Sequence, residues 1–207
     1  MRKPLNVEFT TQWVTAVSVK NETTFGWASV EAAPSLAILA VITRIAQTDE
    51  GHLIKTLEPA WAAILDAISR NPNALHELTP IQLEELVAAS YEKAGFDEVL
   101  LTPRSGDHGR DVIAVKNGRY SIRIIDQVKA FKAGHLVTAN DVRALLGVLA
   151  SDRNASKGVV TTTSDFAPLL KVDPFIAPYM PHRLRLINGK ELSEGLLALG
   201  RKPPFTA

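Results

Sequence analysis

The 207-residue sequence contains no cysteine and no long hydrophobic run. The absence of cysteine excludes disulfide bonds and thiolate metal sites, and it agrees with a reducing compartment such as the cytoplasm. The longest apolar run, 36–42, is far shorter than the roughly 20 residues that a membrane-spanning helix needs. The first residues also lack the apolar core of a signal peptide. We therefore expect a cytoplasmic protein without a membrane segment.

The chain also lacks a strong net charge, because 23 Lys and Arg residues face 22 Asp and Glu residues, which gives +1. The charge is unevenly distributed: residues 1–78 carry 6 basic and 8 acidic residues, and residues 79–207 carry 17 and 14. Between residues 102 and 135, seven basic residues outnumber three acidic ones. A basic surface around an acidic centre suits a phosphate backbone, but a few solvated lysines explain the same numbers.

Residues 1–78 form one expected unit, a small N-terminal α+β segment whose role the sequence does not reveal. Alternating β-branched, aromatic and polar residues over 6–30 predict a short strand hairpin. A helix is expected from the Ala33-Pro34-Ser35 segment to about Gln47, and a second from about Leu57 to Arg70. Residues 74–79 look like a linker.

Residues 79–200 form the second expected unit, a mixed α/β domain. Thr79, Pro80 and Gln82 have the pattern of a helix start, namely a threonine cap, proline at the first position and glutamine three residues after the cap. Helices are expected at 79–95, 139–150 and 191–199, and strands at 99–102, 111–115, 120–129, 157–162 and 184–187. A hairpin followed by a helical crossover to another strand predicts a mixed central sheet flanked by helices.

Candidate catalytic residues lie on two consecutive expected strands. Asp111 starts one strand, and Gln127 and Lys129 alternate along the next, on one face and roughly 7 Å apart. Cutting a phosphodiester needs a metal ion to polarise the phosphate and a positive group to stabilise the developing charge. Mg²⁺ prefers oxygen ligands, which Asp111, the Gln127 side chain and the Val128 carbonyl would supply. Lys129 would orient the attacking water or stabilise the phosphate, and Glu84, beside the apolar stripe of the preceding helix, would hold a water near the metal.

This set depends on the register of the hairpin between the two strands. A two-residue turn at Asn117-Gly118 places Asp111 opposite Ile124, on the face away from Gln127 and Lys129, and a one-residue slip moves it to the same face. The site therefore requires a bulge or a loop of odd length. Singly, Asp111 is explained as well by a turn that bonds its own backbone, and the other two by the solvated face of an edge strand.

The motifs as a set resemble the Mrr-like restriction endonucleases, a branch of the PD-(D/E)XK nuclease superfamily. The resemblance covers about Thr79 to Leu197. Its motifs are Thr-Pro-Ile-Gln-Leu-Glu-Glu-Leu at 79–86, Ala-Gly-Phe at 94–96, Ser-Gly-Asp-His-Gly-Arg-Asp-Val at 105–112, Gln-Val-Lys at 127–129, Leu-Leu-Gly at 145–147, Gly-Val-Val-Thr-Thr-Thr-Ser at 158–164 and Leu-Ile-Asn-Gly at 186–189.

The resemblance implies an αβββαβ core and a Mg²⁺-dependent deoxyribonuclease, with Mn²⁺ as an alternative ion. It places Asp111, Gln127, Lys129 and Glu84 in the active site. The sequence departs from the family pattern at His108, where glycine is common, and at Leu83, where an aromatic residue is common. Neither departure removes the core set, so we expect an active site.

DNA is the expected partner, and the expected role is type IV-like restriction of foreign or modified DNA by a homodimer. Two alternatives remain open: a DNA- or protein-binding module that keeps the nuclease fold without cleaving, and a structure-specific repair nuclease. The residues expected to contact DNA are Arg104, Arg110, Lys132, Thr163 and Ser164. For the last two, a capped strand-to-helix turn explains the sequence equally well, and Asp107 and His108 are read as loop residues in preference to metal ligands.

Overall fold

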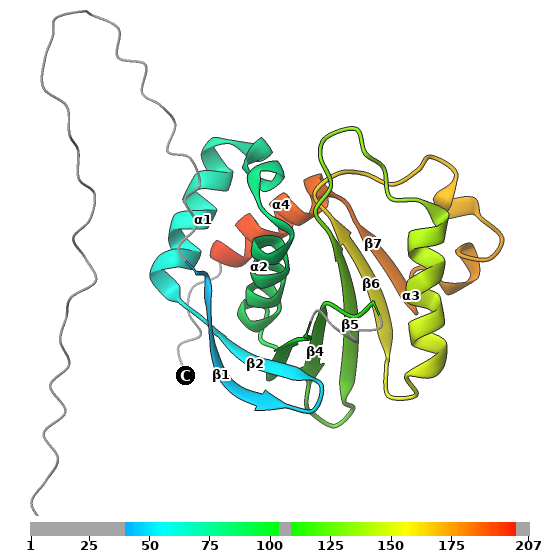
Figure 1. Cartoon of the computed structure of the whole chain (residues 1–207), viewed down its shortest axis with the longest axis horizontal. Helices are drawn as coiled ribbons and strands as arrows, with labels where there is room; N and C mark the ends of the chain where they lie inside the picture. Colours follow the sequence, from blue (N-terminus) through cyan, green and yellow to red (C-terminus); the bar gives the residue numbers. More distant parts are fainter. Residues whose placement is uncertain (1–39, 104–108, 202–207) are drawn as a thin grey trace, which may run out of the picture. The chain divides into compact units, whose positions relative to one another are not determined.

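The computed structural model describes residues 40–103 and 109–201, which build one seven-stranded sheet with its strands in sequence order (Figure 1). Neighbouring strands from β1 to β5 are antiparallel, whereas β5–β6 and β6–β7 are parallel. This mixed sheet confirms the expected fold class. The strands are β1 (Ile42–Thr48), β2 (Gly51–Thr56), β3 (Glu98–Leu101), β4 (Val112–Lys116), β5 (Ile122–Lys129), β6 (Lys157–Thr162) and β7 (Leu184–Ile187).

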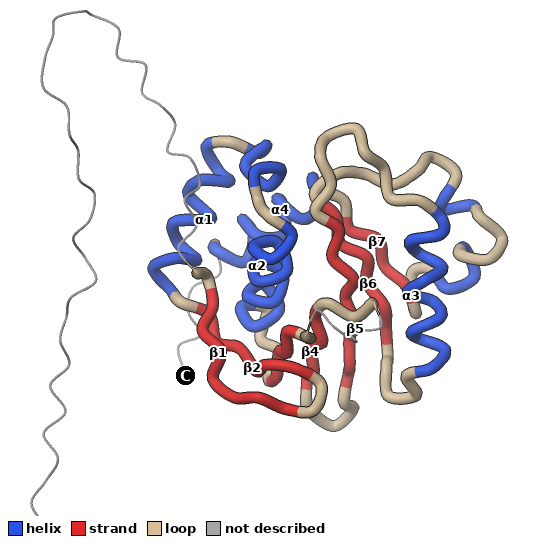
Figure 2. The backbone as a smooth tube through the Cα atoms, in the orientation of Figure 1, coloured by secondary structure: helices blue, strands red, loops and turns tan. Residues whose placement is uncertain are grey.

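In the described part of the chain, four α-helices cover the two faces of the sheet (Figure 2). Helices α1 (Glu58–Arg70), α2 (Pro80–Lys93) and α4 (Gly189–Gly200) pack on one face, and α3 (Ala139–Ser151) packs on the other. The expected caps at Thr79 and Thr138 are both capping boxes. No helix among the described residues is long and apolar enough to cross a membrane. Residues 40–103 and 109–201 also contain three short 3₁₀ helices: η1 (Pro72–Glu77), η2 (Leu170–Val172) and η3 (Ala177–Tyr179).

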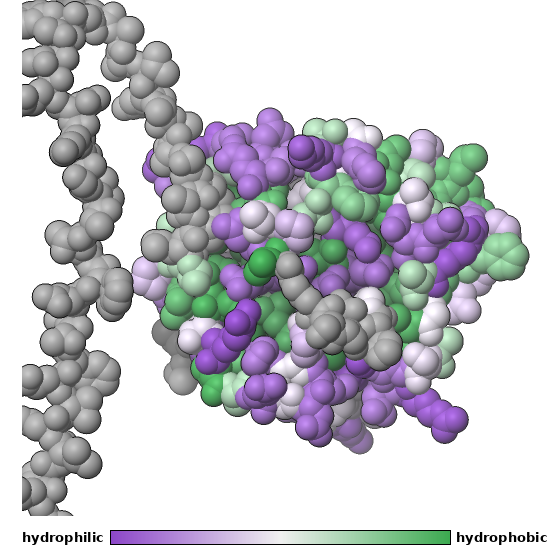
Figure 3. Space-filling view, viewed as in Figure 1, coloured by the Kyte–Doolittle hydropathy of each residue, from purple (hydrophilic) through white to green (hydrophobic). Residues whose placement is uncertain are grey.

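The two faces of the sheet hold two separate hydrophobic clusters. Val112 and Val128 belong to the cluster under α1, α2 and α4, whereas Ile125 and Val160 belong to the cluster under α3. Because side chains alternate along a strand, this division places the odd-numbered residues of β5 on the α3 face. On the outer surface drawn in Figure 3, hydrophobic residues form small groups separated by hydrophilic ones.

The helix expected to reach Gln47 is a wrong prediction over its described part. Residues from Ile42 form β1, which pairs with β2 through a turn at Asp49 and Glu50. The β-branched residues of this stretch fit a strand, and Gly51 allows the hairpin to form next to β3. A Cβ at Gly51 would overlap the Leu101 carbonyl, and its φ of +153° is one that side chains rarely adopt. The helix expected from Leu57 is confirmed as α1.

Residues 41–78 share the core of the residues that follow them. Trp61 and Ile64 of α1 are buried in the same cluster as Leu83 of α2. The expected linker at 74–79 is largely helix η1, in which Leu75 is 2% exposed, so this stretch packs into the fold. Whether a family domain starts at residue 79 stays a prediction. The expected hairpin at 6–30 lies outside the described residues.

Candidate active site

An odd-length loop sets the register of β4 and β5. The two strands are joined by residues 117–121, a five-residue loop, and Val112 pairs with Asp126. Asp111 directly precedes Val112, and its amide donates to the Asp126 carbonyl at 3.1 Å, so Asp111 contacts the residue that pairs with Val112. The sequence prediction of an odd-length loop is therefore confirmed.

The Asp111 carboxylate is fixed at the end of β4. Its Oδ2 accepts a hydrogen bond of 2.7 Å from the Val128 amide. On the other side, the Thr102 amide donates to the Asp111 carbonyl at 3.2 Å. Backbone contacts from β3 and β5 thus set the position of this side chain. β4 begins at Val112, whereas β5 continues for three residues beyond the partner of Val112. Asp111 lies where β4 stops and β5 continues, and we call this place the step at the sheet edge.

The side-chain oxygen of Gln127 forms no hydrogen bond with any described residue. The side chain is 6% exposed, and its Oε1 is buried without a hydrogen-bond partner among the described residues. Gly109 lies against its amide nitrogen, where an added Cβ would come within 3.2 Å. Leaving a buried polar atom unpaired costs free energy, so such an atom commonly marks a ligand site. The Val128 carbonyl points to the same strand edge as the Val128 amide, and hence toward Asp111.

Lys129 ends β5 next to the start of α3. Its carbonyl accepts hydrogen bonds from the Thr163 amide and the Thr162 hydroxyl, which fixes the backbone, while the half-buried side chain stays on the Gln127 face. Burial alone would raise the pKa of Asp141, but hydrogen bonds from Thr138 and the charges of Lys129 and His135 bring that pKa below its ordinary value. The positive charge of Lys129 therefore favours the ionised form of Asp141 at the N-terminus of α3.

Glu84 lies in the first half of α2 and is half-buried. The C-terminal end of α2 lies near the far end of β4, because the Lys116 side chain donates to the Gly95 carbonyl. The first turns of α2 consequently lie toward the Asp111 end of the sheet. Helix α2 covers the face opposite Gln127, so Glu84 approaches the site from the other side of the step at the sheet edge.

The donor set at this edge contains oxygen atoms only. The described residues contain no group of three or more His, Cys, Asp or Glu side chains placed to hold a metal ion. The predicted set differs from such a group because it combines the Asp111 carboxylate with an amide oxygen and a backbone carbonyl. These are hard ligands of the kind that Mg²⁺ accepts while keeping several waters.

A family model described as a restriction endonuclease, Mrr_cat, matches residues 75–196, more than half of the chain. The chain belongs to the Mrr_cat restriction endonuclease family. No curated protein matches it.

Solved structures that match include two restriction endonucleases. The DNA modification-dependent restriction endonuclease AspBHI is 18% identical with a TM-score of 0.46, and the match covers 69% of this chain and 35% of that one. The MspJI restriction endonuclease, in complex with a 27-mer oligonucleotide, is 17% identical with a TM-score of 0.42, over 66% of this chain and 30% of that one. The chain thus spans about a third of the length of either protein.

The residues expected to contact DNA in this Mrr_cat domain are in different environments. Lys132 is exposed, and Ser164 is half-buried beside an open pocket of about 610 Å³. Thr163 is 3% exposed, and its hydroxyl both donates to the Phe131 carbonyl and accepts from the Phe131 amide. Arg110 lies within 4 Å of two carboxylates. Arg104, like Asp107 and His108, lies outside the described residues.

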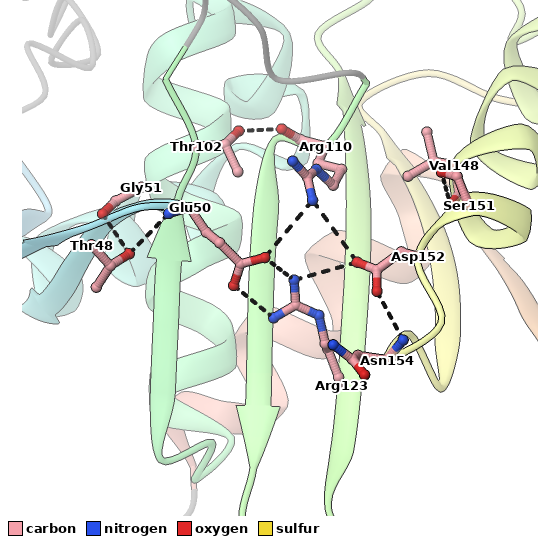
Figure 4. A network of polar contacts seen from close by, with 10 residues as sticks. All are labelled: Thr48, Glu50, Gly51, Thr102, Arg110, Arg123, Val148, Ser151, Asp152 and Asn154. Atoms are coloured by element: carbon pink, nitrogen blue, oxygen red, sulfur yellow. Dashed lines mark hydrogen bonds and ion pairs between the residues drawn. The ribbon is translucent and has the colours of Figure 1, made fainter.

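Two polar groups near the site were not predicted. Asp126, wholly buried on the α2 side of β5, accepts hydrogen bonds at Oδ2 from Tyr91 and Thr161. The sequence offers one signal for it, a lone acidic residue inside the apolar run of β5. The second group joins Glu50 to Arg123, which are 73 residues apart, and only the fold reveals it (Figure 4).

Proposed function

We propose that this chain is a Mg²⁺-dependent endonuclease that hydrolyses phosphodiester bonds of DNA. The observation that carries the proposal is the odd-length loop between β4 and β5, because the set of Asp111, Gln127 and Lys129 requires such a loop or a bulge. Membership of the Mrr_cat family supports it.

The metal would be held by the Asp111 carboxylate, the Gln127 Oε1 atom and the Val128 carbonyl. The unpaired, buried Oε1 supports this assignment, because a cation would supply the missing partner. When bound, the cation polarises the phosphate and promotes ionisation of water at neutral pH. Mn²⁺ has the same ligand preference and would substitute.

The side chains would divide the remaining work. Asp111 is held by the Val128 amide, so its carboxylate keeps one orientation when substrate binds. The Lys129 ammonium would stabilise the negative charge that develops on the phosphate, or orient the attacking water. Glu84 would accept a hydrogen bond from water on the other side of the edge.

DNA would lie along the end of the sheet where Lys129 is found. The pocket of about 610 Å³ lies there, lined by Ser164, His76 and Lys190 among others, and exposed Lys132 is nearby in sequence. Cationic side chains on this surface would contact phosphates and position the duplex. The substrate of the reaction would be foreign or modified DNA, in a restriction system.

The test is a cleavage assay with Mg²⁺ on unmodified, modified and branched DNA in parallel. Lys129→Ala should lower the cleavage rate by at least about 10²-fold, because the developing charge loses its stabilising group. Folding and DNA affinity should remain close to those of the wild type. Lys157→Ala, at the opposite end of the parallel strands, is the matched control and should cleave normally.

Cleavage by Lys129→Ala at the wild-type rate would remove Lys129 from the mechanism. A wild-type chain that binds DNA but neither cleaves it nor binds Mg²⁺ in a direct titration would instead be a binding module with a nuclease fold. Preference for branched DNA over modified linear DNA would indicate a repair nuclease.

A further inference from the structure

Two arginines and two acidic residues form a cluster next to Asp111, which we call the four-charge cluster: Glu50, Arg110, Arg123 and Asp152 (Figure 4). Arg123 binds Glu50 through both terminal nitrogens, at 3.1 and 2.6 Å, and Asp152 at 3.4 Å. Arg110 approaches the same two carboxylates at 3.8 and 3.9 Å. Each carboxylate therefore lies between two guanidinium groups.

The members of the four-charge cluster come from four separate parts of the fold. Glu50 is in the β1–β2 turn, Arg123 is in β5, Asp152 caps the C-terminus of α3, and Arg110 directly precedes Asp111. Arg123 and Asp152 are the most buried, with side chains 14% and 12% exposed. Burial alone would lower the pKa of Arg123, but the hydrogen bonds and charges of Glu50 and Asp152 raise that pKa above its ordinary value. The cluster is thus anchored on Arg123 and Asp152, and Glu50 is its most exposed member.

The backbone that carries Asp111 is held next to the four-charge cluster. The Thr102 hydroxyl donates to the carbonyl of Arg110, and the Thr102 amide donates to the carbonyl of Asp111. The backbone is therefore held from the β3 side, and the Arg110 side chain is held from the α3 side. Between these two attachments the Asp111 carboxylate reaches the Val128 amide.

We propose that Glu50 and Asp152 are positioning residues for catalysis: they hold Arg110, and through it they keep the Asp111 carboxylate in the orientation that receives the metal. This inference rests on the proposed function, in which Asp111 is a metal ligand. Groups that orient metal ligands commonly change metal affinity 10–100-fold when they are replaced. Arg110 is then part of the scaffold, in contrast to the DNA contact that the sequence suggested.

A role of Arg110 in DNA binding makes the opposite prediction. To reach a phosphate, its guanidinium would have to leave two carboxylates, and neutralising either carboxylate would make it more available. Glu50→Gln should then tighten DNA binding, and loss of Arg110 should weaken it and reduce the salt dependence by about one counterion. In the positioning role, DNA affinity in the absence of metal stays within about twofold of wild type and the metal affinity falls.

The experiment measures binding of Mn²⁺ alone to the full chain by electron paramagnetic resonance, together with DNA affinity in a chelator. Glu50→Gln and Asp152→Asn should each weaken Mn²⁺ binding by about 10-fold or more. Arg110→Met should do the same, whereas Arg110→Lys, which keeps the charge, should recover most of the affinity. Asp66→Asn, which breaks the exposed Asp66–Arg70 pair on α1, is the control and should change nothing.

Mn²⁺ affinity that is unchanged in Glu50→Gln, Asp152→Asn and Arg110→Met overturns the inference, provided that Asp111→Ala abolishes Mn²⁺ binding. If the wild type binds no Mn²⁺, the proposed function fails and the inference fails with it. The unfolding midpoint of each variant is measured in chelator. Arg110→Met keeps both pairs of Arg123, so it retains the fold and decides the outcome if Glu50→Gln does not fold.

Discussion

Asp126 is the residue whose environment differs most from that of an ordinary aspartate. Its carboxyl is wholly buried, Oδ2 accepts from Tyr91 at 2.9 Å and from Thr161 at 2.8 Å, and Oδ1 has no partner among the described residues. Burial raises the pKa of Asp126 to about 8; the two hydrogen bonds work against this shift and the charge of Asp111 adds to it. At neutral pH this carboxyl is therefore mainly protonated, one residue before a proposed metal ligand.

This raised pKa predicts a pH dependence of stability in metal-free protein. Unfolded aspartate titrates near pH 4, so between about pH 4 and 8 the folded chain holds a proton that the unfolded chain has lost. The contribution of Asp126 to stability is thus full below pH 4, falls by up to about 1.4 kcal/mol per pH unit, and levels off above pH 8. The side chain of Asp126→Asn is neutral at every pH, so this variant lacks the slope. In urea unfolding with chelator, its free energy of unfolding minus that of wild type should therefore increase from pH 5 to pH 8.

Asp97 offers a control with the opposite shift. A hydrogen bond from the Asn117 amide and one from Lys116 lower the pKa of this exposed carboxyl. Asp97→Asn should therefore show no gain in stability at alkaline pH. Parallel stability curves of wild type and Asp126→Asn from pH 5 to 8 would show that Asp126 is ionised in the folded chain.

Individual residues differ in how far their roles were predictable. Asp111, Gln127 and Lys129 stand out because they lie close together in sequence at strand ends and because the motif around them resembles a known family. Glu50 and Asp152 do not, since each is an ordinary surface-type acid until the fold brings it to an arginine far along the chain. For Asp126 the sequence gives only the residue type, which does not reveal that the carboxyl is buried against Tyr91 and Thr161.

Among the elements, the β1–β2 hairpin depends most on a single residue. β2 pairs with β3 only through His52 and Leu53, and Gly51 begins the strand at that contact. Its missing side chain lets β2 approach the Leu101 carbonyl, and its positive φ suits glycine. The same turn carries Glu50 of the four-charge cluster.

Gly51→Ala should destabilise the chain by about 1–3 kcal/mol, because the added methyl meets backbone that must shift. The change in the urea unfolding midpoint measures this effect. Gly147→Ala is the matched control: Gly147 lies in the middle of α3 with open space around it, so the same substitution should stabilise by about 0.5–1 kcal/mol. Equal effects of the two substitutions would contradict the close packing of β2 on β3.

Helices and strands differ in how well the sequence predicts them. The helices with capping boxes were predicted within about two residues, because the cap is a local signal read from Thr79 or Thr138. The register of β4 and β5 was predicted only as a condition, since loop geometry decides it and Asn117-Gly118 alone favours a shorter turn. β1 was missed because its apolar residues, Ile42, Ile45 and Ala46, do not alternate as in a half-buried strand, and pairing with β2 decided its form.

Among the described residues, one chain offers one candidate active site. Both strands of a duplex are cut either by two sites acting together or by one site acting twice. A closed homodimer provides two sites related by a twofold axis, which suits the two strands of DNA. We therefore expect the active species to be a dimer on DNA.

Mixing wild type with Lys129→Ala at a constant total concentration distinguishes these two routes. If a dimer cuts both strands, an equal mixture forms about half of its dimers with one competent subunit, because the two chains exchange at random. Such dimers nick supercoiled plasmid, so nicked circles should accumulate and linear product should fall to about a quarter of the wild-type yield at short times. A monomer that acts twice would give linear product in proportion to the wild-type chain alone. The reading is gel densitometry of supercoiled, nicked and linear DNA over time, with Lys157→Ala as the mixing control that leaves the linear yield unchanged.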